Sequence, residues 1–237
     1  MQVLRDIFQV AGDLNGITFD APDAMWNDGN AYVVRTKEGL IMIDCGCGDT
    51  LDQIFDNMRY WGLSVEDIRY CILTHPHFDH AGGGHLLKAR GVHFIASAET
   101  ADAVASGDER CAGFLYHKTF QPFVVDKVVD DGEEIDVIGI KFKAMHLPGH
   151  SMGCTAFSLE WEGRTIVFSG DVIGTLGIGD FGWSGSIDFD KTVYIASLRK
   201  FANVDMDVML PGHGLVYFHK PRRRVEYVLN QALMLWR

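Results

Sequence analysis

The sequence Thr-His-Pro-His-Phe-Asp-His, residues 74–80, decides more about the fold of this chain than any other stretch. It follows an apolar run at residues 68–73 and places four metal-binding side chains within six positions: His75, His77, Asp79 and His80. Ordinary cores and surfaces do not need that density of imidazole and carboxylate groups. A single motif match can be accidental, so the hypothesis of a metal site depends on partners elsewhere in the chain.

Three such partners stand in glycine-containing loops beside other apolar runs: His150, Asp171 and His213. Alone, either histidine would more often be an ordinary loop residue, and Asp171 could cap a helix. Together with residues 74–80 they predict one site on loops that a rigid scaffold holds in place. Side chains two positions apart in extended backbone face the same way, so His75 and His77 can reach one ion. The fold must then bring distant strand ends to one edge.

The number of these side chains predicts two metal ions. Seven ligands exceed the four of a structural zinc or the three of a catalytic zinc. Three histidines on one ion, an aspartate and two histidines on the other, and one shared carboxylate would use all seven. Nitrogen and carboxylate ligands without thiolate fit Zn²⁺, the divalent ion that we expect, and also iron or manganese. The other histidines have no partner at motif spacing and are interpreted as structural or surface residues: His85, His93, His117, His146 and His219.

Hydrophobic periodicity predicts a layered α/β arrangement in one domain, residues 1–237. Strands and helices alternate in both halves, which favours sheets in the middle with helices outside. The metal-type residues run from 75 to 213, so any division would separate ligands of one site. The predicted strands are 31–35, 40–43, 68–73, 92–96, 123–129, 134–138, 140–145, 155–161, 165–168 and 208–210. The predicted helices are 50–61, 79–90, 99–105, 192–201 and 221–236.

Charge and composition exclude several classes of function. The net charge is −11 and no long cluster of Lys and Arg occurs, which argues against nucleic-acid binding. The short basic run at 222–224 is a solvated helix start or an anchor for an anionic substrate tail. Five cysteines without a Cys-x-x-Cys pair indicate reduced thiols in a cytoplasm, with Cys45 and Cys47 as small packing residues. Neither a signal peptide nor an 18-residue apolar stretch is present, so no membrane role is expected.

At this point the chain resembles the metallo-β-lactamase-fold hydrolases. The motifs at 75–80, 148–150, 169–171 and 211–214 match that superfamily in order, and Asp44 matches its recurrent structural aspartate. The resemblance implies a four-layer αββα sandwich of two similar halves with the metal site at one edge. It assigns His75, His77 and His150 to the first metal. It assigns Asp79, His80 and His213 to the second metal, with Asp171 as the bridge.

The bridging position separates the branches of this superfamily. Zinc β-lactamases place Cys or Ser there, whereas Asp171 is similar to the residue of glyoxalase II-like thioesterases and acyl-homoserine lactonases. The Asn-x-Tyr of Asn30 and Tyr32 also resembles the opening of glyoxalase II-like proteins. The chain ends soon after His213, without the helical region that holds glutathione in glyoxalase II, so glutathione thioesters are less expected. The tRNA-binding arm of ribonuclease Z-like nucleases is also missing.

The resemblance implies hydrolysis of a small-molecule acyl substrate. Two ions about 3.5–4 Å apart can share a hydroxide at neutral pH. That hydroxide would attack a thioester, lactone or related ester, with Asp79 orienting the water and Asp171 holding the ions together. We expect His75, His77 and His80 to complete the catalytic set. Aromatic residues at 116, 181, 183, 217 and 218 and the loop 178–188 are candidates for substrate selection, with plain packing as the alternative.

Other functions remain open from the residues. Persulfide dioxygenases share the fold with one iron, and flavodiiron proteins use two irons but carry Glu at the position of His77 and a further domain. β-Lactamase or phosphodiesterase activity on the same scaffold is another alternative. A non-enzymatic role for the metals is the third. The apolar face of the last helix, around Val225, Val228 and Trp236, would pack on its own domain or on a second subunit as a homodimer.

Overall fold

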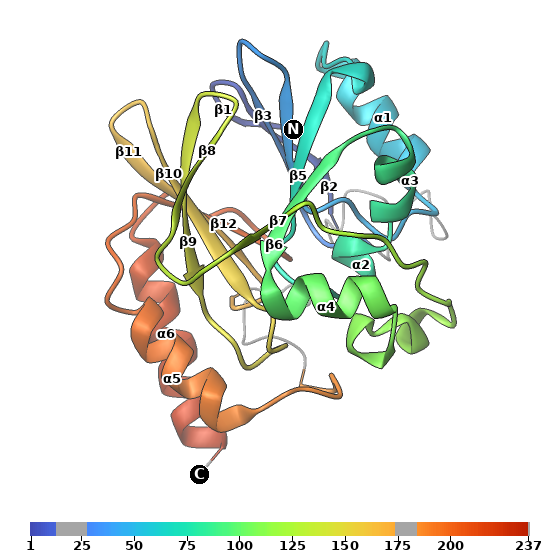
Figure 1. Cartoon of the computed structure of the whole chain (residues 1–237). Coiled ribbons are helices and arrows are strands. Elements are labelled where there is room, and N and C mark those ends of the chain that lie inside the picture. The colour runs from blue at the N-terminus through green and yellow to red at the C-terminus, as the bar shows by residue number, and fades with distance from the viewer. Residues whose placement is uncertain (13–27, 174–183, 237) are drawn as a thin grey trace, which may run out of the picture.

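The computed structural model describes residues 1–12, 28–173 and 184–236. Two β-sheets face each other, with helices on the outer side of each sheet (Figure 1). Helices α1 to α4 cover the first sheet, and α5 and α6 cover the second. The predicted four-layer α/β fold is therefore confirmed. No helix in the described part of the chain is long and apolar enough to cross a membrane.

The first sheet is parallel around the strand that precedes residues 74–80. Its order is β1 to β7, antiparallel from β1 to β4 and parallel from β4 to β7. Carboxyl ends of parallel strands meet at one edge of a sheet. The strands are Gln2–Leu4, Ile7–Ala11, Ala31–Arg35, Leu40–Ile43, Ile68–Ile72, His93–Ser97 and Lys127–Val129. The helices are α1 (Leu51–Tyr60), α2 (Phe78–Ala81), α3 (Gly84–Ala89) and α4 (Ala98–Ser106).

The second sheet has the order β12-β11-β10-β9-β8. Strands β8 to β11 pair antiparallel, and β12 pairs parallel to β11, so β11 and β12 end at the same edge. The strands are β8 (Glu134–Val137), β9 (Ile140–His146), β10 (Thr155–Trp161), β11 (Arg164–Gly170) and β12 (Val208–Pro211). Helices α5 (Lys191–Phe201) and α6 (Pro221–Leu235) pack on the outer face of this sheet.

Three buried clusters fill the three interfaces between the four layers. Alternation along β3 shows the principle, because side chains of a strand point to opposite faces in turn. Val33 joins the cluster under α1, whereas Tyr32 and Val34 join the cluster between the sheets. A third cluster, with Tyr194 and Val228, lies between the second sheet and helices α5 and α6. The interior of the sandwich is thus apolar, and the polar site is confined to its edge.

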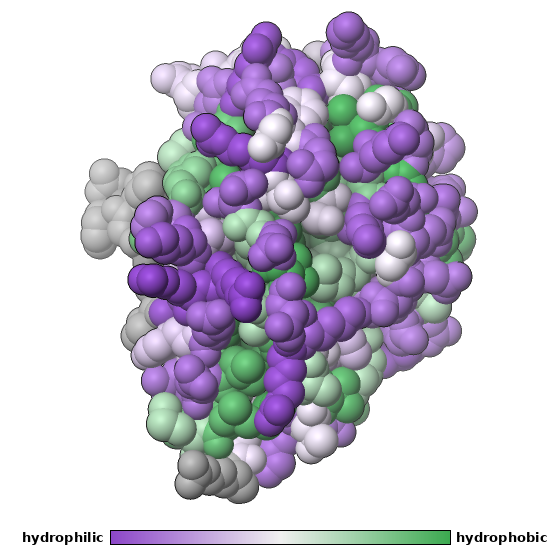
Figure 2. Space-filling model, turned by 90° about the vertical axis from the view of Figure 1, so that its left-hand side faces the viewer, coloured by the Kyte–Doolittle hydropathy of each residue, from purple (hydrophilic) through white to green (hydrophobic). Residues whose placement is uncertain are grey.

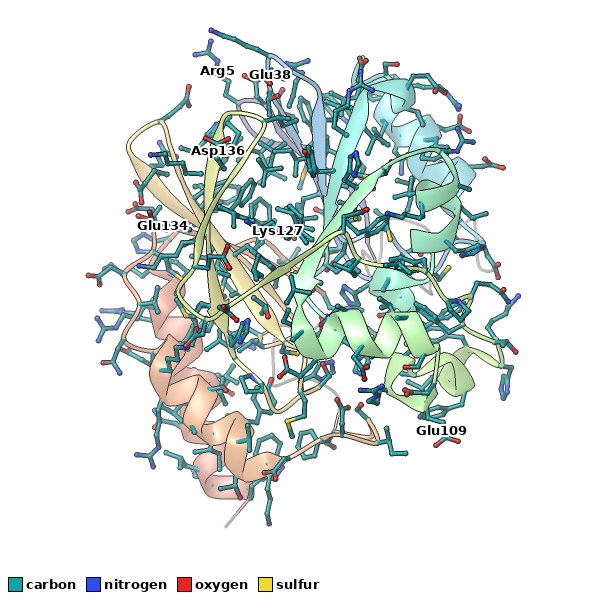
Figure 3. All side chains as sticks on the ribbon, viewed as in Figure 1. Arg5, Glu38, Glu109, Lys127, Glu134 and Asp136 are labelled. Carbon is teal, nitrogen blue, oxygen red and sulfur yellow. The ribbon has the colours of Figure 1, made fainter. Side chains whose placement is uncertain are left out.

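The surface over α5, α6 and the adjoining hairpins is mostly hydrophilic, with small hydrophobic areas (Figure 2). Helix α6 leaves Tyr227, Met234 and Leu235 exposed. Charged side chains such as Arg5, Glu38 and Asp136 project beside the hairpin turns at the top of Figure 3. These turns precede β2, β4 and β9, so they lie at the edge opposite the strand ends that lead to the seven His and Asp residues.

Most predicted elements are confirmed within a few residues, and two predicted elements differ. The predicted helix 79–90 divides into α2 and α3 at Gly82 and Gly83. A Cβ on Gly82 would stand 2.6 Å from the Cys47 carbonyl oxygen, so these glycines let the loop 45–48 approach the backbone. The predicted strand 123–129 is ordered as β7 only over Lys127–Val129. Strands β1 and β2 were not predicted.

Candidate metal centre

Seven His and Asp side chains meet at one edge of the sandwich, and each is at most 9 % exposed. The loop after β5 and the following helix α2 supply four of them, the run 75–80. The other three stand in loops of the second sheet: His150 between β9 and β10, Asp171 directly after β11, and His213 after β12. The structure therefore brings all seven residues singled out in the sequence to one place.

The first group contains only imidazoles. The potential ligand atoms of His75, His77 and His150 lie within 4.8 Å of one another. His77 Nδ1 is 3.0 Å from His150 Nε2. His75 Nε2 is buried and has no hydrogen-bond partner among the described residues. A buried polar atom without a partner is costly, so this nitrogen fits a position where it would bind an ion.

The second group combines a carboxylate with two imidazoles. Asp79 Oδ2 lies 3.0 Å from His213 Nε2 and 3.4 Å from His80 Nε2. The two Nε2 atoms of His80 and His213 are 3.2 Å apart. The potential ligand atoms of these three residues also lie within 4.8 Å of one another, close enough to share an ion. Nitrogen and oxygen donors at this spacing fit a first-row divalent metal.

Asp171 touches both groups. Its Oδ2 lies 3.4 Å from His150 Nε2 of the first group and 3.3 Å from His213 Nε2 of the second. Its Oδ1 lies 3.3 Å from His80 Nε2. A carboxylate offers two oxygens and about four lone-pair sites, so one side chain can serve two ions. The position of Asp171 is the one that a bridging ligand would take.

Asp44 and Thr74 orient two of the imidazoles from behind. The Thr74 hydroxyl donates to Asp44 Oδ2 at 2.7 Å and lies 3.0 Å from His75 Nδ1. Since its hydrogen goes to the carboxylate, the hydroxyl oxygen accepts from His75 Nδ1, which leaves Nε2 free. Asp44 Oδ2 also lies 2.9 Å from His80 Nδ1. Asp44 therefore acts as a hydrogen-bond acceptor on the far side of the rings, as carboxylates behind metal-binding histidines do.

Residues near the start of the chain hold the loop of His213. The Asn30 amide donates to the carbonyl oxygens of Pro211 at 2.9 Å and Gly214 at 3.1 Å. The Tyr32 hydroxyl donates to the same Pro211 oxygen at 2.8 Å. We call these contacts the Asn30–Tyr32 clamp. It gives the Asn-x-Tyr pattern a physical role, which is to fix the loop after β12 from the opposite sheet.

The electrostatics of the site favour metal ligation. Burial and the neighbouring imidazoles lower the pKa of His75 well below its usual range, and burial beside His150 lowers the pKa of His77 to about 3. Burial alone would raise the pKa values of Asp79 and Asp171, but the surrounding imidazoles hold both well below their usual range. These groups are thus neutral imidazoles and ionised carboxylates, the forms that bind metals.

His80 differs from His75 and His77 in its protonation. Burial disfavours its charged form, but the carboxylates of Asp79 and Asp171 raise its pKa well above the usual range. Without an ion, His80 therefore carries the proton that balances part of the carboxylate charge. Because metals bind the neutral imidazole, occupancy would release this proton. The positive charge would then come from the metal instead.

The other residues considered for the site fall into two sets. The Tyr116 ring stacks on Phe78 at 5.3 Å, and the carboxylates of Asp79 and Asp171 add to burial in raising the pKa of its phenol. Tyr116 therefore lies beside the site. The remaining set includes His117, His219 and Phe218, which are exposed, and Tyr217, which pairs through its backbone with Met209. Of the candidate loop 178–188, residues 178–183 lie outside the described part.

Two contributors to the site were missed in the sequence. Thr74 precedes the first histidine, and Ser186 lies 3.2 Å from His77 Nε2 through its hydroxyl oxygen. Neither hydroxyl has a spacing that marks it. Thr74 could have been suspected from its place between a strand and the first ligand, whereas Ser186 comes from a distant segment.

The comparison with known families identifies the class of protein. A model of the metallo-beta-lactamase superfamily matches residues 24–213. The chain belongs to that superfamily. The expected resemblance is therefore confirmed at the level of the superfamily.

Curated relatives have diverse names. A lactamase-like protein adaB from Aspergillus niger is 26 % identical over 231 residues, which cover 96 % of this chain and 63 % of that protein. An atrochrysone carboxyl ACP thioesterase from Passalora fulva is 28 % identical over 208 residues, 86 % of this chain and 53 % of the relative. The chain thus spans between about half and two thirds of the length of these relatives.

Solved structures of low identity share the fold. A mutant of a metallo-beta-lactamase from Cronobacter sakazakii has a TM-score of 0.76 at 21 % identity. The match covers 100 % of this chain and 94 % of the Cronobacter sakazakii chain. A beta-lactamase from Chitinophaga pinensis has a TM-score of 0.72 at 22 % identity, covering 98 % and 92 %. At this identity the likeness supports the αββα architecture alone.

Proposed function

We propose that this chain is a hydrolase that uses two divalent metal ions to cleave a thioester, a lactone or a related carboxylic ester. The observation that carries the proposal is the placement of Asp171 between the imidazoles of the first group and the Asp79 group. Zn²⁺ suits the donor set, and iron and manganese are alternatives for the same ligands. When bound, such ions polarise a carbonyl group and supply a nucleophilic hydroxide at neutral pH.

The residues of the chain have separate tasks in this proposal. His75, His77 and His150 would hold one ion, and Asp79, His80 and His213 the other. Asp171 would keep the two sites at a fixed separation, and Asp79 would also accept a hydrogen bond from the attacking water. Asp44 and Thr74 keep Nε2 of His75 and His80 turned inward, so the donor set is oriented before an ion arrives.

Nucleophilic catalysis by a cysteine receives no support from the site. Burial raises the pKa of the Cys154 thiol to about 12, and burial with the nearby Asp28 raises that of Cys47 to about 12. A thiol reacts as the thiolate, so these groups are inert at neutral pH. All five cysteines are free and buried, which supports packing roles and a reducing compartment such as the cytoplasm.

The preference for acyl substrates rests on two supports. One relative at 28 % identity is named a thioesterase, and the aspartate at the bridging position resembles thioesterases and lactonases rather than β-lactamases. A small-molecule substrate is proposed because the net charge of −11 disfavours nucleic acid.

The test combines metal analysis with a substrate panel on one preparation of the full chain. We expect two equivalents of metal per chain and turnover of thioesters or lactones that exceeds turnover of β-lactams and phosphodiesters. His77→Ala should abolish that turnover with the fold retained by circular dichroism. One bound iron with oxidation of a persulfide, or metal binding without any ester turnover, would contradict the proposal.

A further inference from the structure

A hydroxyl and a carboxylate stand behind His77 on the side away from the metal group. Ser186 Oγ lies 3.2 Å from His77 Nε2, and the Ser186 hydroxyl donates to Asp188 Oδ1 at 2.5 Å. Asp188 Oδ2 accepts from the Met152 backbone N–H at 2.8 Å. The contact between Ser186 and His77 is buried, and the two hydrogen bonds of Asp188 are partly buried. The three side chains form a line from the imidazole to the backbone of the loop that carries His150.

The direction of each hydrogen bond in this line is fixed. A carboxylate only accepts, so both oxygens of Asp188 require donors. The single hydroxyl hydrogen of Ser186 satisfies one of them, and Met152 N–H satisfies the other. Ser186 Oγ can then only accept from His77, which must carry its hydrogen on Nε2. The lone pair of a neutral His77 therefore lies on Nδ1, the nitrogen 3.0 Å from His150 Nε2.

The same segment is tied to the backbone beside His150. Asp190 N–H donates to the Gly149 carbonyl oxygen at 3.0 Å. The Asp190 side chain caps α5 by accepting from the backbone N–H groups of Thr192 and Val193. Residues 186–190 are thus fixed at one end by a helix and along their length by the 149–152 loop. This gives Ser186 a rigid base from which to orient His77.

We propose that Ser186 and Asp188 are positioning residues for the first metal group, because they hold His77 in the tautomer that presents Nδ1. The hydrogen bonds themselves are present in the metal-free chain. Only their purpose, the orientation of His77 toward a metal ion, rests on the proposed function. Thr74 and Asp44 make the equivalent arrangement behind His75, with a hydroxyl between imidazole and carboxylate. A hydroxyl backed by a carboxylate therefore orients each of the two first-group histidines from residues 75–80, with the hydrogen on Nδ1 in His75 and on Nε2 in His77.

Three substitutions separate the steps of this arrangement. Ser186→Ala removes the acceptor for His77, and Ser186→Thr restores a hydroxyl at the same position. Asp188→Asn keeps the shape but reverses the line, because Met152 N–H needs the amide oxygen and the amide nitrogen then faces Ser186. The hydroxyl hydrogen would turn to His77 and favour the tautomer with the hydrogen on Nδ1. Ser184→Ala is the matched control, an exposed serine two positions earlier in the segment.

The first measurement uses the metal-free protein. Nitrogen-15 shifts of the His77 ring report which nitrogen carries the hydrogen. We expect the Nε2–H form in the wild type, Ser186→Thr and Ser184→Ala, a mixture in Ser186→Ala, and the Nδ1–H form in Asp188→Asn. An unchanged tautomer in both Ser186→Ala and Asp188→Asn would overturn the inference. This outcome does not depend on any turnover.

The second measurement is Zn²⁺ affinity by competition with a chelator. Loss of a partner behind a ligand costs about 10- to 100-fold in metal affinity. We expect one of the two affinities to fall by that amount in Ser186→Ala and Asp188→Asn, with the other within about threefold and Ser186→Thr close to wild type. Equal falls at both sites with a lower melting temperature of the metal-free protein would show a structural role and overturn the inference. Two intact sites in a wild type without ester turnover would contradict the proposed function alone.

Discussion

The two halves of the chain supply the metal centre in different ways. The first half gives four of the seven proposed ligands from one short run, His75 to His80, at the end of a single strand. The second half gives His150, Asp171 and His213 singly, from three loops more than twenty residues apart. Local backbone geometry positions the four residues of the run 75–80, whereas packing of the second sheet positions the other three. The centre is therefore complete only when both sheets are joined, and Asp171 is the point where they meet.

Removal of Asp171 should have the largest effect, because this side chain joins the contributions of the two halves. Asp171→Ala deletes the side chain whose oxygens lie beside His150 of the first group and beside His80 and His213 of the second. We expect turnover to fall by more than about 100-fold, beyond the usual cost of a residue behind a ligand. Metal analysis should show fewer than two ions per chain. Asp205→Ala, at a fully exposed side chain, is the control, and near-normal activity of Asp171→Ala would contradict the bridging role.

Metal removal should lower the stability of the folded chain, because the proposed ligands come from both halves. Ions that bind only the folded chain stabilise it by about 2.7 kcal/mol per site at a concentration 100 times the dissociation constant. Chelation should therefore lower the melting temperature, and addition of Zn²⁺ should restore it. The check is a thermal melt with and without chelator at fixed protein concentration. Equal melting temperatures would show that the seven residues hold no ion under those conditions.

Thr74→Val tests the support of the first half alone. The substitution keeps the shape of the side chain but removes the hydroxyl between His75 Nδ1 and Asp44 Oδ2. We expect metal affinity to fall by about 10- to 100-fold, because His75 loses the acceptor that fixes its tautomer. Thr74→Ser retains the hydroxyl and should stay close to wild type. Chelator competition measures both, and an equal loss in Thr74→Ser would assign the effect to packing.

Tyr32→Phe tests the support of the second half and should have the smallest effect. It removes one hydrogen bond to the Pro211 carbonyl oxygen, which the Asn30 amide still contacts. A buried hydrogen bond contributes about 1 kcal/mol, so the free energy of unfolding should fall by roughly that amount. Urea unfolding of the metal-free protein measures it. A loss above about 3 kcal/mol would mean that the ring also moves in the core.

Much of the fold follows from local patterns in the sequence. The alternation of polar and apolar residues in β8 and the spacing of Leu51, Ile54, Phe55 and Met58 in α1 each record which face is buried. The break between α2 and α3 was missed because Gly82 is required by a tertiary contact with the 45–48 loop rather than by helix propensity. Strand β2 was missed, although all five of its residues are buried. A strand with both faces covered shows no alternation.

The residues of the site also differ in how far the sequence reveals them. The seven His and Asp residues could be found because imidazoles and carboxylates of this density, next to strand ends, have few other uses. Ser186 could not be found in this way, and Thr74 could be suspected only from its place before His75, since a hydroxyl that orients an imidazole looks like any loop hydroxyl until the contact is known. Ser186 lies 109 residues from His77, so only the folded chain relates them. Residues 178–183, expected to border the substrate, lie outside the described part.

The Asn30–Tyr32 clamp has a consequence for how the protein is made. Asn30 and its acceptor at Pro211 are separated by 181 residues. During synthesis the first sheet leaves the ribosome well before β12. Residues 75–80 are therefore exposed before the loop that carries His213 has been made. Contacts of such long range slow folding, because a large loop must close before the contact forms. An ion captured early by residues 75–80 would therefore be held by an incomplete set of ligands until the end of the chain arrives.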